Sequence, residues 1–317
     1  MGGLLFGAAQ AQNIGLFAST SNVANYGMTS PDGATFTDRT IASGAVDVAW
    51  NGTVFCALIG TRTSYTSTDG ITWTSHATAL PNSGGNNWNK IRWGNGVFLA
   101  FQSTTATTAA ATSPDGVTWT ARTMPSSQNW RDAIWNGFVW VAVNSSALTS
   151  LNCSAYSSDN ATWARGNLTN STTGIYTVGW NGTVFTANGR FNDFYYGYDG
   201  VNWNTNYGVV GLSGRTPLEK TLYNGTVLVM IAGNDGYYGV SSDGIAWTFG
   251  LLPAGTQVIR DNFAWNGSTF CLLGNIGGTT YPFTSSNGID WTKGGGTPQT
   301  PVTQGGMTAS YLQWGTY

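Results

Sequence analysis

The sequence predicts an all-β chain that folds as a seven-bladed β-propeller of four-stranded antiparallel blades. Three observations carry this prediction: a turn motif that occurs seven times, an Asn-Gly hairpin motif that occurs six times, and the absence of helical periodicity. The composition agrees with it. Charged residues make up only 8% of the 317 residues, while Gly (44) and aromatic residues (14%) are plentiful, as many short strands joined by tight turns require.

The turn motif reads S-x-D-G-x-x-W and recurs about every 44 residues, as expected for a repeat protein. We call these segments the Asp turns, and they are SPDGATF (30–36), STDGITW (67–73), SPDGVTW (113–119), SSDNATW (157–163), GYDGVNW (197–203), SSDGIAW (241–247) and SSNGIDW (285–291). The carboxylate can accept backbone N–H bonds within its own turn, and the Gly tolerates positive φ. We therefore expect a structural role for the residues at this position, Asp32, Asp69, Asp115, Asp159, Asp199, Asp243 and Asn287. Asn160 replaces the Gly of the fourth turn, a change that a turn can absorb.

The hairpin motif precedes the Asp turn in six repeats. Its copies begin with an aromatic residue and read WNGTVF (50–55), WGNGVF (93–98), WNGFVW (135–140), WNGTVF (180–185), YNGTVL (223–228) and WNGSTF (265–270). Asn-Gly between apolar runs predicts a type I′ turn, in which both central residues have positive φ. Each repeat then reads strand, hairpin, strand, variable loop, strand, Asp turn, strand.

The two ends of the chain predict how the ring closes. One repeat lacks the hairpin motif. At the C-terminal end, Tyr311 to Trp314 matches the first strand of a repeat. At the N-terminal end, residues 13–17 match the second strand of a repeat, ahead of the Asp turn that contains Asp32. We therefore expect a single domain over 1–317, closed by a blade made of residues 13–40 and 308–317. Residues 1–12 are an N-terminal extension of uncertain structure.

The Asp turns resemble the Asp-box (BNR) repeat of sialidases and related β-propellers. That resemblance implies a β-propeller fold, and it makes glycoside hydrolysis an activity to test against the residues. Retaining sialidases use an arginine triad, a Tyr paired with Glu, an Asp acid and an F/Y-R-I-P signature, which this chain lacks. Its one Glu, Glu219, could pair only with Asp261, and a strand-end salt bridge is the simpler explanation. The one His, His76, has no partner ligands in sequence and reads as an exposed loop residue. We expect no enzymatic activity, no cofactor and no metal.

Ligand contacts are expected on the loops opposite the Asp turns, because loops on a rigid scaffold usually carry binding. Aromatic and Arg residues are the usual interface anchors, and the candidates are Trp88, Trp130, Arg131, Tyr207 and Arg215. Alignment of the first strands on the hairpin aromatic places seven residues at one level of the central channel: Asp47, Lys90, Asp132, Thr177, Lys220, Asn262 and Tyr311. This polar ring suits either water or a small ligand.

Composition and charge argue against several classes of partner and location. With 12 basic and 14 acidic residues and a pI near 5.2, the chain lacks the positive field that nucleic acids select. No basic n-region or apolar run of membrane-spanning length occurs, so neither a secretory signal nor membrane insertion is expected. Cys56 and Cys271 occupy the same repeat position and read as small buried hydrophobes; Cys153 is unassigned.

The low charge, the near-identical turn modules, and the lack of a catalytic set and of an export signal together resemble the Asp-box propellers of bacteriophage particles. The resemblance implies a virion surface protein such as a tail fibre, receptor-binding or capsid decoration component, present in several copies and contacting other virion proteins or host cell-surface glycans. A free glycan-binding lectin is the first alternative, and a divergent sialidase-like hydrolase is the second.

Overall fold

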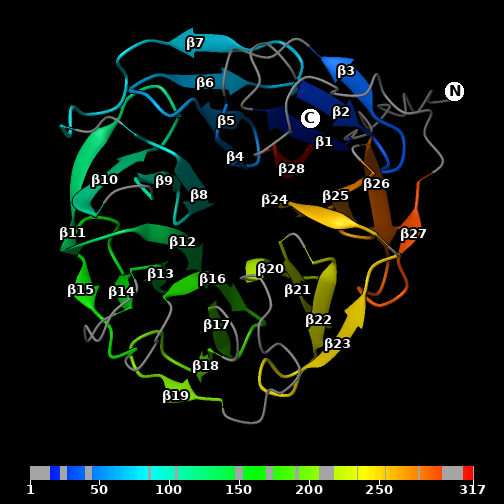
Figure 1. Cartoon of the computed structure of the whole chain (residues 1–317). Helices are drawn as coiled ribbons and strands as arrows, with labels where there is room; N and C mark the ends of the chain where they lie inside the picture. Colours follow the sequence, from blue (N-terminus) through cyan, green and yellow to red (C-terminus); the bar gives the residue numbers. More distant parts are fainter. Residues whose placement is uncertain are drawn as a thin grey trace, which may run out of the picture.

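The computed structural model describes residues 15–21, 27–39, 45–84, 87–103, 106–146, 153–168, 174–189, 193–206, 218–233, 235–253, 255–277, 279–294 and 310–316. Its strands form four-stranded antiparallel sheets that follow one another around a ring, with the first strand of each sheet nearest the centre (Figure 1). Within the described ranges, the chain has no helix with the length and hydrophobicity that a membrane crossing requires.

Six of these sheets are blades made of consecutive strands. Blade I is β4 (Asp47–Trp50), β5 (Phe55–Leu58), β6 (Ser64–Ser67) and β7 (Thr74–His76). Blade II is β8 (Lys90–Gly94), β9 (Val97–Phe101), β10 (Thr107–Ser113) and β11 (Thr120–Gln128). Blade III is β12 (Trp130–Trp135), β13 (Trp140–Asn144), β14 (Ser154–Ser157) and β15 (Ala164–Arg165). Blade IV is β16 (Ile175–Trp180), β17 (Phe185–Gly189), β18 (Phe194–Gly197) and β19 (Asn204–Thr205). Blade V is β20 (Leu218–Tyr223), β21 (Leu228–Ala232), β22 (Tyr237–Ser241) and β23 (Thr248–Leu251). Blade VI is β24 (Gln257–Trp265), β25 (Phe270–Ile276), β26 (Thr279–Ser285) and β27 (Thr292–Lys293).

The remaining sheet, which we call the closing sheet, combines both ends of the chain. Its order is β28 (Ser310–Thr316), β1 (Gly15–Ser21), β2 (Gly27–Ser30) and β3 (Thr37–Arg39). Phe17 of β1 pairs with Trp314 on one side and with Ser30 on the other. The expected count of seven blades is corrected accordingly: six blades are continuous stretches of chain, and the other four-stranded sheet is a composite whose innermost strand comes from the C-terminal end.

The hairpin turns differ from the predicted type in five of six copies. Only Asn95-Gly96 has positive φ at both residues, 47° and 73°, as a type I′ turn requires. Asn51 illustrates the other form: its Oδ1 accepts the N–H groups of Thr53 and Val54 at 2.8 and 2.7 Å, while only Gly52 has positive φ. In WGNGVF the Asn is the second residue after the aromatic, but in WNGTVF it is the first, where its side chain caps the turn instead.

The Asp turns have the predicted internal geometry. In the third, Asp115 Oδ1 accepts the Ser113 hydroxyl and the N–H groups of Val117 and Thr118, at 2.8 to 2.9 Å. Asn160 takes the Gly position with a φ of 65°, and Asn287 Oδ1 accepts two backbone N–H groups as an aspartate does. Both substitutions therefore preserve the turn, as the sequence predicts.

Several Asp turns also pack on the preceding blade, which the sequence did not reveal. A Cβ added to Gly116 of blade II would lie 2.8 Å from Cys56 Sγ of blade I, and one added to Gly288 of blade VI would lie 2.3 Å from Val229 Cγ2 of blade V. At these two positions only Gly fits the approach at ideal geometry. The Asp turns therefore join neighbouring blades as well as neighbouring strands.

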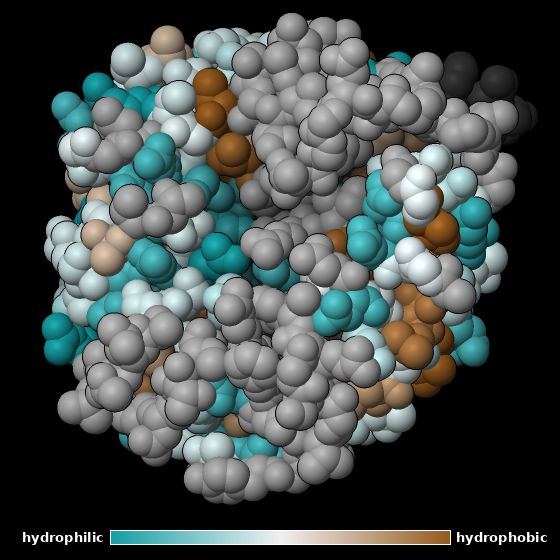
Figure 2. Space-filling model, viewed as in Figure 1, coloured by the Kyte–Doolittle hydropathy of each residue, from teal (hydrophilic) through white to brown (hydrophobic). Residues whose placement is uncertain are grey.

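The hydrophobic core lies between the sheets. One cluster combines Cys56 and Leu58 of blade I with Ile91 and Phe98 of blade II, and similar clusters join the later blades. The described part of the surface in Figure 2 is mostly neutral to hydrophilic, with hydrophobic residues in separate patches. Blade-to-blade packing thus holds the ring together.

Candidate binding site in the central channel

Two aspartates of the channel ring tie neighbouring inner strands together. Asp47 of β4 accepts the N–H of Val48 through Oδ1 at 2.9 Å and the N–H of Ile91, in the next blade, through Oδ2 at 3.0 Å. Asp132 of β12 repeats this arrangement with Ala133 and, in blade IV, with the N–H of Val178 at 3.1 Å. These carboxylates are therefore hydrogen-bonded structural groups at the centre of the ring.

Arg92 connects the two carboxylates. It lies on β8 between them, with Nη1 2.8 Å from Asp47 Oδ2 and Nε 2.7 Å from Asp132 Oδ1. The side chains of Asp47 and Asp132 are 5% and 7% exposed, so these are charge-assisted bonds away from bulk water. The guanidinium thus links the inner strands of blades I, II and III, and its direction is fixed.

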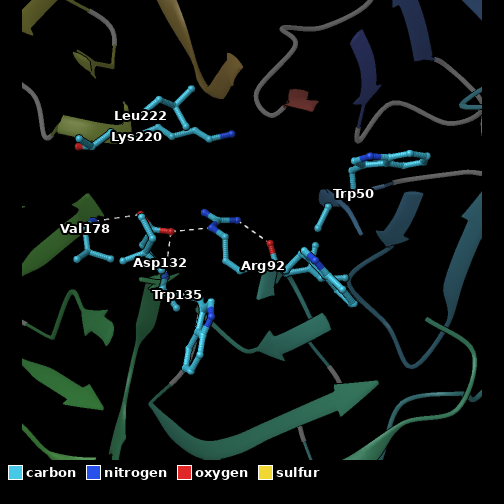
Figure 3. Close-up of a pocket in the computed structure, with 13 residues that line it drawn as sticks. Trp50, Arg92, Asp132, Trp135, Val178, Lys220 and Leu222 are labelled. Carbon is cyan, nitrogen blue, oxygen red and sulfur yellow. Dashed lines mark hydrogen bonds and ion pairs between the residues drawn. The ribbon is translucent and has the colours of Figure 1, made fainter. Parts of the chain in front are cut away.

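A cavity of about 230 Å³ opens above Arg92. The aromatic residues of three hairpin motifs, Trp50, Trp93 and Trp135, line it together with Asp132 and Lys220. Figure 3 shows Lys220 extending from β20 across the cavity from the side opposite Arg92, with Trp50 and Trp135 at its edges. Indole faces beside two cationic groups and a carboxylate suit a small polar group with an apolar face, such as a sugar ring or a peptide side chain.

A second row of side chains crosses three blades near the starts of the inner strands. Arg131, Tyr176 and Glu219 each occupy the bulge in the pairing of the first two strands of blades III, IV and V. Arg131 lies over the Tyr176 ring, 5.0 Å from its centroid, and its Nη2 is 3.6 Å from Glu219 Oε2. A β-bulge re-aims the extra side chain, which is how these three residues come into line. Glu219 is therefore ion-paired across blade IV.

The structure places the five predicted ligand-contact residues in different environments. Trp88 and Trp130 have no exposed surface and belong to the clusters between blades I and II and blades II and III, so their expected ligand contact is corrected: both are core residues. Arg131 is partly exposed in the row just described. Tyr207 and Arg215 lie outside the described residues, as does the side chain of Asp261.

His76 also differs from expectation. It lies at the end of β7, partly buried, with Nε2 2.8 Å from the Thr66 hydroxyl, and is not in an exposed loop. Over the described ranges, no three His, Cys, Asp or Glu side chains lie together in a way that could hold a metal ion. All three cysteines are buried and unpaired with one another.

The residues that sequence reasoning missed are Arg92 and the walls of the cavity. The hairpin aromatics mark strand ends in the sequence, and because one occurs in each repeat at the same register, they must lie at one level of the channel. Arg92 had a signal too, since it follows the ring residue Lys90 by two positions and therefore faces the same side of its strand.

The geometry of inner strands around a channel is shared with solved structures. The chain has a β-propeller fold. "YCF48 bound to D1 peptide" is 14% identical, with 90% of this chain and 85% of that chain covered and a TM-score of 0.56. Selenomethionine-substituted virginiamycin B lyase from Staphylococcus aureus is 9% identical, with 87% and 88% covered and a TM-score of 0.62. Apo AztD from Citrobacter koseri is 8% identical, with 95% and 97% covered and a TM-score of 0.54. No protein-family model and no curated protein sequence matches the chain.

Proposed function

We propose that the chain is a non-enzymatic binding propeller that makes protein–protein contacts and is displayed in several copies on a virus particle. The observation that carries this proposal is the channel cavity. Two of its lining charges, Arg92 and Asp132, are held by their ion pair, by Asp47 and by N–H groups of the inner strands, so this side of the cavity is preorganised. A preorganised recess of this kind lowers the entropic cost of binding.

The engagement of the carboxylates supports a non-enzymatic role. In each Asp turn with an aspartate, Oδ1 accepts hydrogen bonds within the turn, and Glu219 faces Arg131. A glycosidase needs two carboxyl groups placed across one bond, one of them free to donate a proton. The Asp-turn carboxylates and Glu219 are instead engaged by groups of the fold.

Two of the similar structures support a protein partner. One is described as YCF48 with a bound peptide, and another, "Crystal Structure of Mitotic Checkpoint Complex", is 10% identical with a TM-score of 0.56. Function depends on sites more than on fold, so these support the class of contact and not a particular partner. The virion setting rests on the resemblance of this low-charge repeat to bacteriophage propellers. In this setting, the loops opposite the Asp turns face the partner or host.

A free glycan-binding lectin is the second candidate, because indole walls beside polar groups also suit a sugar ring. Calorimetric titration of the purified protein with mono- and disaccharides separates it from the first. Saturable binding that is lost in Lys220→Met and kept in Lys293→Met, a matched change on the exposed outer strand β27, would favour the lectin.

The test of the leading proposal is electron cryomicroscopy of purified particles from the virus that encodes this chain. We expect ring-shaped density at a fixed number of copies per particle, with one face of the ring against a neighbouring protein. Absence of the protein from the particles would contradict virion display, and turnover of a fluorogenic glycoside would contradict the non-enzymatic role.

A further inference from the structure

Among the described residues, most of the exposed large apolar side chains lie in turns at one face of the ring. Six large hydrophobic side chains are exposed among the described residues: Ile71 (37%), Val117 (40%), Phe138 (82%), Tyr198 (60%), Leu251 (61%) and Ile289 (52%). Five of them lie in Asp turns or hairpin loops, and only Leu251 lies elsewhere, at the far end of β23. The first-to-second and third-to-fourth strand turns of an antiparallel blade are at the same end, so these five share one face, which we call the Asp-turn face.

The turns themselves do not require these side chains. Ile71, Val117 and Ile289 follow the turn glycine, a position that Val201 and Ile245 also occupy in their turns. In two other turns this residue is Ala34 or Ala161, and the turn keeps the same hydrogen bonds. Phe138 stands where four of the other five hairpins have Thr or Ser. Since smaller residues serve the fold equally well, repeated exposed apolar residues on one face indicate an interaction surface.

The Asp turns and hairpin loops of this face carry acidic side chains and no basic ones. They include the six Asp-turn aspartates and Asp290, which together are seven of the chain's 14 acidic residues, and no Lys or Arg occurs in any Asp turn or hairpin loop. In Asp115 and Asp243, burial raises the pKa, but backbone N–H bonds and a serine hydroxyl outweigh it and hold the pKa below its usual value. The Asp115 and Asp243 carboxylates therefore remain ionised at any pH near neutral.

We propose that the Asp-turn face docks onto a protein surface that presents Lys or Arg side chains around apolar sockets. The apolar tips would fill the sockets, and the ring of carboxylates would meet the basic groups, giving complementarity of shape and charge. The inference goes beyond the proposed function, since it concerns attachment through the turns and does not depend on what the channel or the opposite loops bind.

The test uses a defined probe, a fluorescent amphipathic peptide of Lys and Leu, with a Glu and Leu peptide of the same length as its counterpart. We expect the full chain to bind the Lys/Leu peptide at least tenfold more tightly than the Glu/Leu peptide, with affinity that falls as salt is raised. Phe138→Ser combined with Ile71→Ser should weaken this binding at least fivefold.

Leu251→Ser is the matched control, because Leu251 is an exposed apolar residue (61%) at the other end of a blade, and this change should leave the affinity unchanged. Asp115→Asn with Asp243→Asn should weaken binding and its salt dependence while keeping the turns, since Asn287 shows that Asn serves there. Unfolding midpoints confirm that each variant is folded. The proposal would be overturned if both peptides bound equally, or if Leu251→Ser weakened binding as much as the Phe138→Ser and Ile71→Ser double variant. It would also be overturned if the chain self-associated and Phe138→Ser abolished that association. Lys220→Met should not change peptide binding, which keeps this test separate from that of the channel.

Discussion

The Sγ atom of Cys271 lies 3.1 Å from the carbonyl oxygen of Gly33, a residue 238 positions earlier in the chain. Cys56 in blade I has the same relationship to Gly116 in blade II, at 4.0 Å. Gly33 belongs to the Asp turn of the closing sheet, so this turn packs on blade VI as the turns at Gly116 and Gly288 pack on the blades before them. The ring therefore closes through the same contact that joins its interior blades.

We expect Cys56 and Cys271 to be unreactive in the folded protein. Burial, with a smaller contribution from Asp115 or Asp32, raises the pKa of both thiols well above the usual value, and the thiolate is the reactive form. An aromatic disulfide reagent at pH 8 should modify neither residue until urea unfolds the chain. Rapid modification of either thiol without urea, located by mass spectrometry, would contradict the closed ring.

Gly288→Ala should destabilise the protein far more than Gly225→Ala. Both residues have positive φ, 76° and 95°, which costs alanine about 1 to 2 kcal/mol. A Cβ at 288 would also lie 2.3 Å from Val229 Cγ2, whereas a Cβ at 225 meets nothing within 4 Å. Overpacking adds about 1 to 3 kcal/mol at 288 only. Urea unfolding of the two variants measures the difference, and equal losses would show that the Asp turn does not bear on the preceding blade.

Trp119→Ala should lower the free energy of unfolding by about 3 to 5 kcal/mol, the usual cost of removing a buried large aromatic residue. Its indole is 9% exposed, packs in the cluster between blades I and II, and donates Nε1–H to the Gly116 carbonyl at 3.1 Å. Trp73→Ala is the matched control, because Trp73 holds the same repeat position in blade I and is only partly buried. Its loss should be smaller. A loss below about 1 kcal/mol at Trp119 would contradict its place in the core.

Arg92→Met should destabilise the protein by about 3 to 5 kcal/mol, because removing one partner leaves buried carboxylates uncompensated. Asp47 and Asp132 would both lose their cation. Adding Asp132→Asn to Arg92→Met should recover part of the loss, since one uncompensated charge is then removed. Chemical unfolding of the single and double variants at pH 7 measures both effects. A double variant less stable than Arg92→Met would show that Asp132 contributes mainly through its backbone bonds.

Stability should decrease as the pH falls below about 4, the ordinary pKa of an aspartate. The folded state holds the pKa of Asp32, Asp69, Asp115, Asp199 and Asp243 below that value, because hydrogen bonds within each turn outweigh the opposing effect of burial; at Asp159 the backbone bonds alone dominate. A lowered folded pKa gives stabilisation that is complete above the unfolded pKa and is lost as the pH falls towards the folded pKa.

The replacement Asp115→Asn tests this origin of the acid sensitivity. Asn keeps the acceptor oxygen but does not titrate, so the variant should lose less stability than the wild type between pH 5 and pH 2.5. Urea midpoints over that range provide the measurement. An identical pH dependence in both proteins would mean that other groups control acid unfolding.

The sequence by itself determined the elements of this protein. Seven Asp turns and six Asn-Gly motifs fixed where strands end, because a turn that needs positive φ or a side-chain cap is encoded locally. The pairing of the C-terminal strand with the N-terminal strand also followed, since a strand without a partner at each end leaves one arrangement that satisfies both; the register of Phe17 with Trp314 came from the structure.

Only the tertiary structure decided which residues meet across blades. The row of Arg131, Tyr176 and Glu219, the link of Arg92 to Asp47 and Asp132, and the burial of Trp88 and Trp130 all depend on contacts between segments about 40 or more residues apart. A repeat pattern states which strand a residue is on and which side it faces. It does not state how closely neighbouring blades approach or which bulge re-aims a side chain, and these set the site.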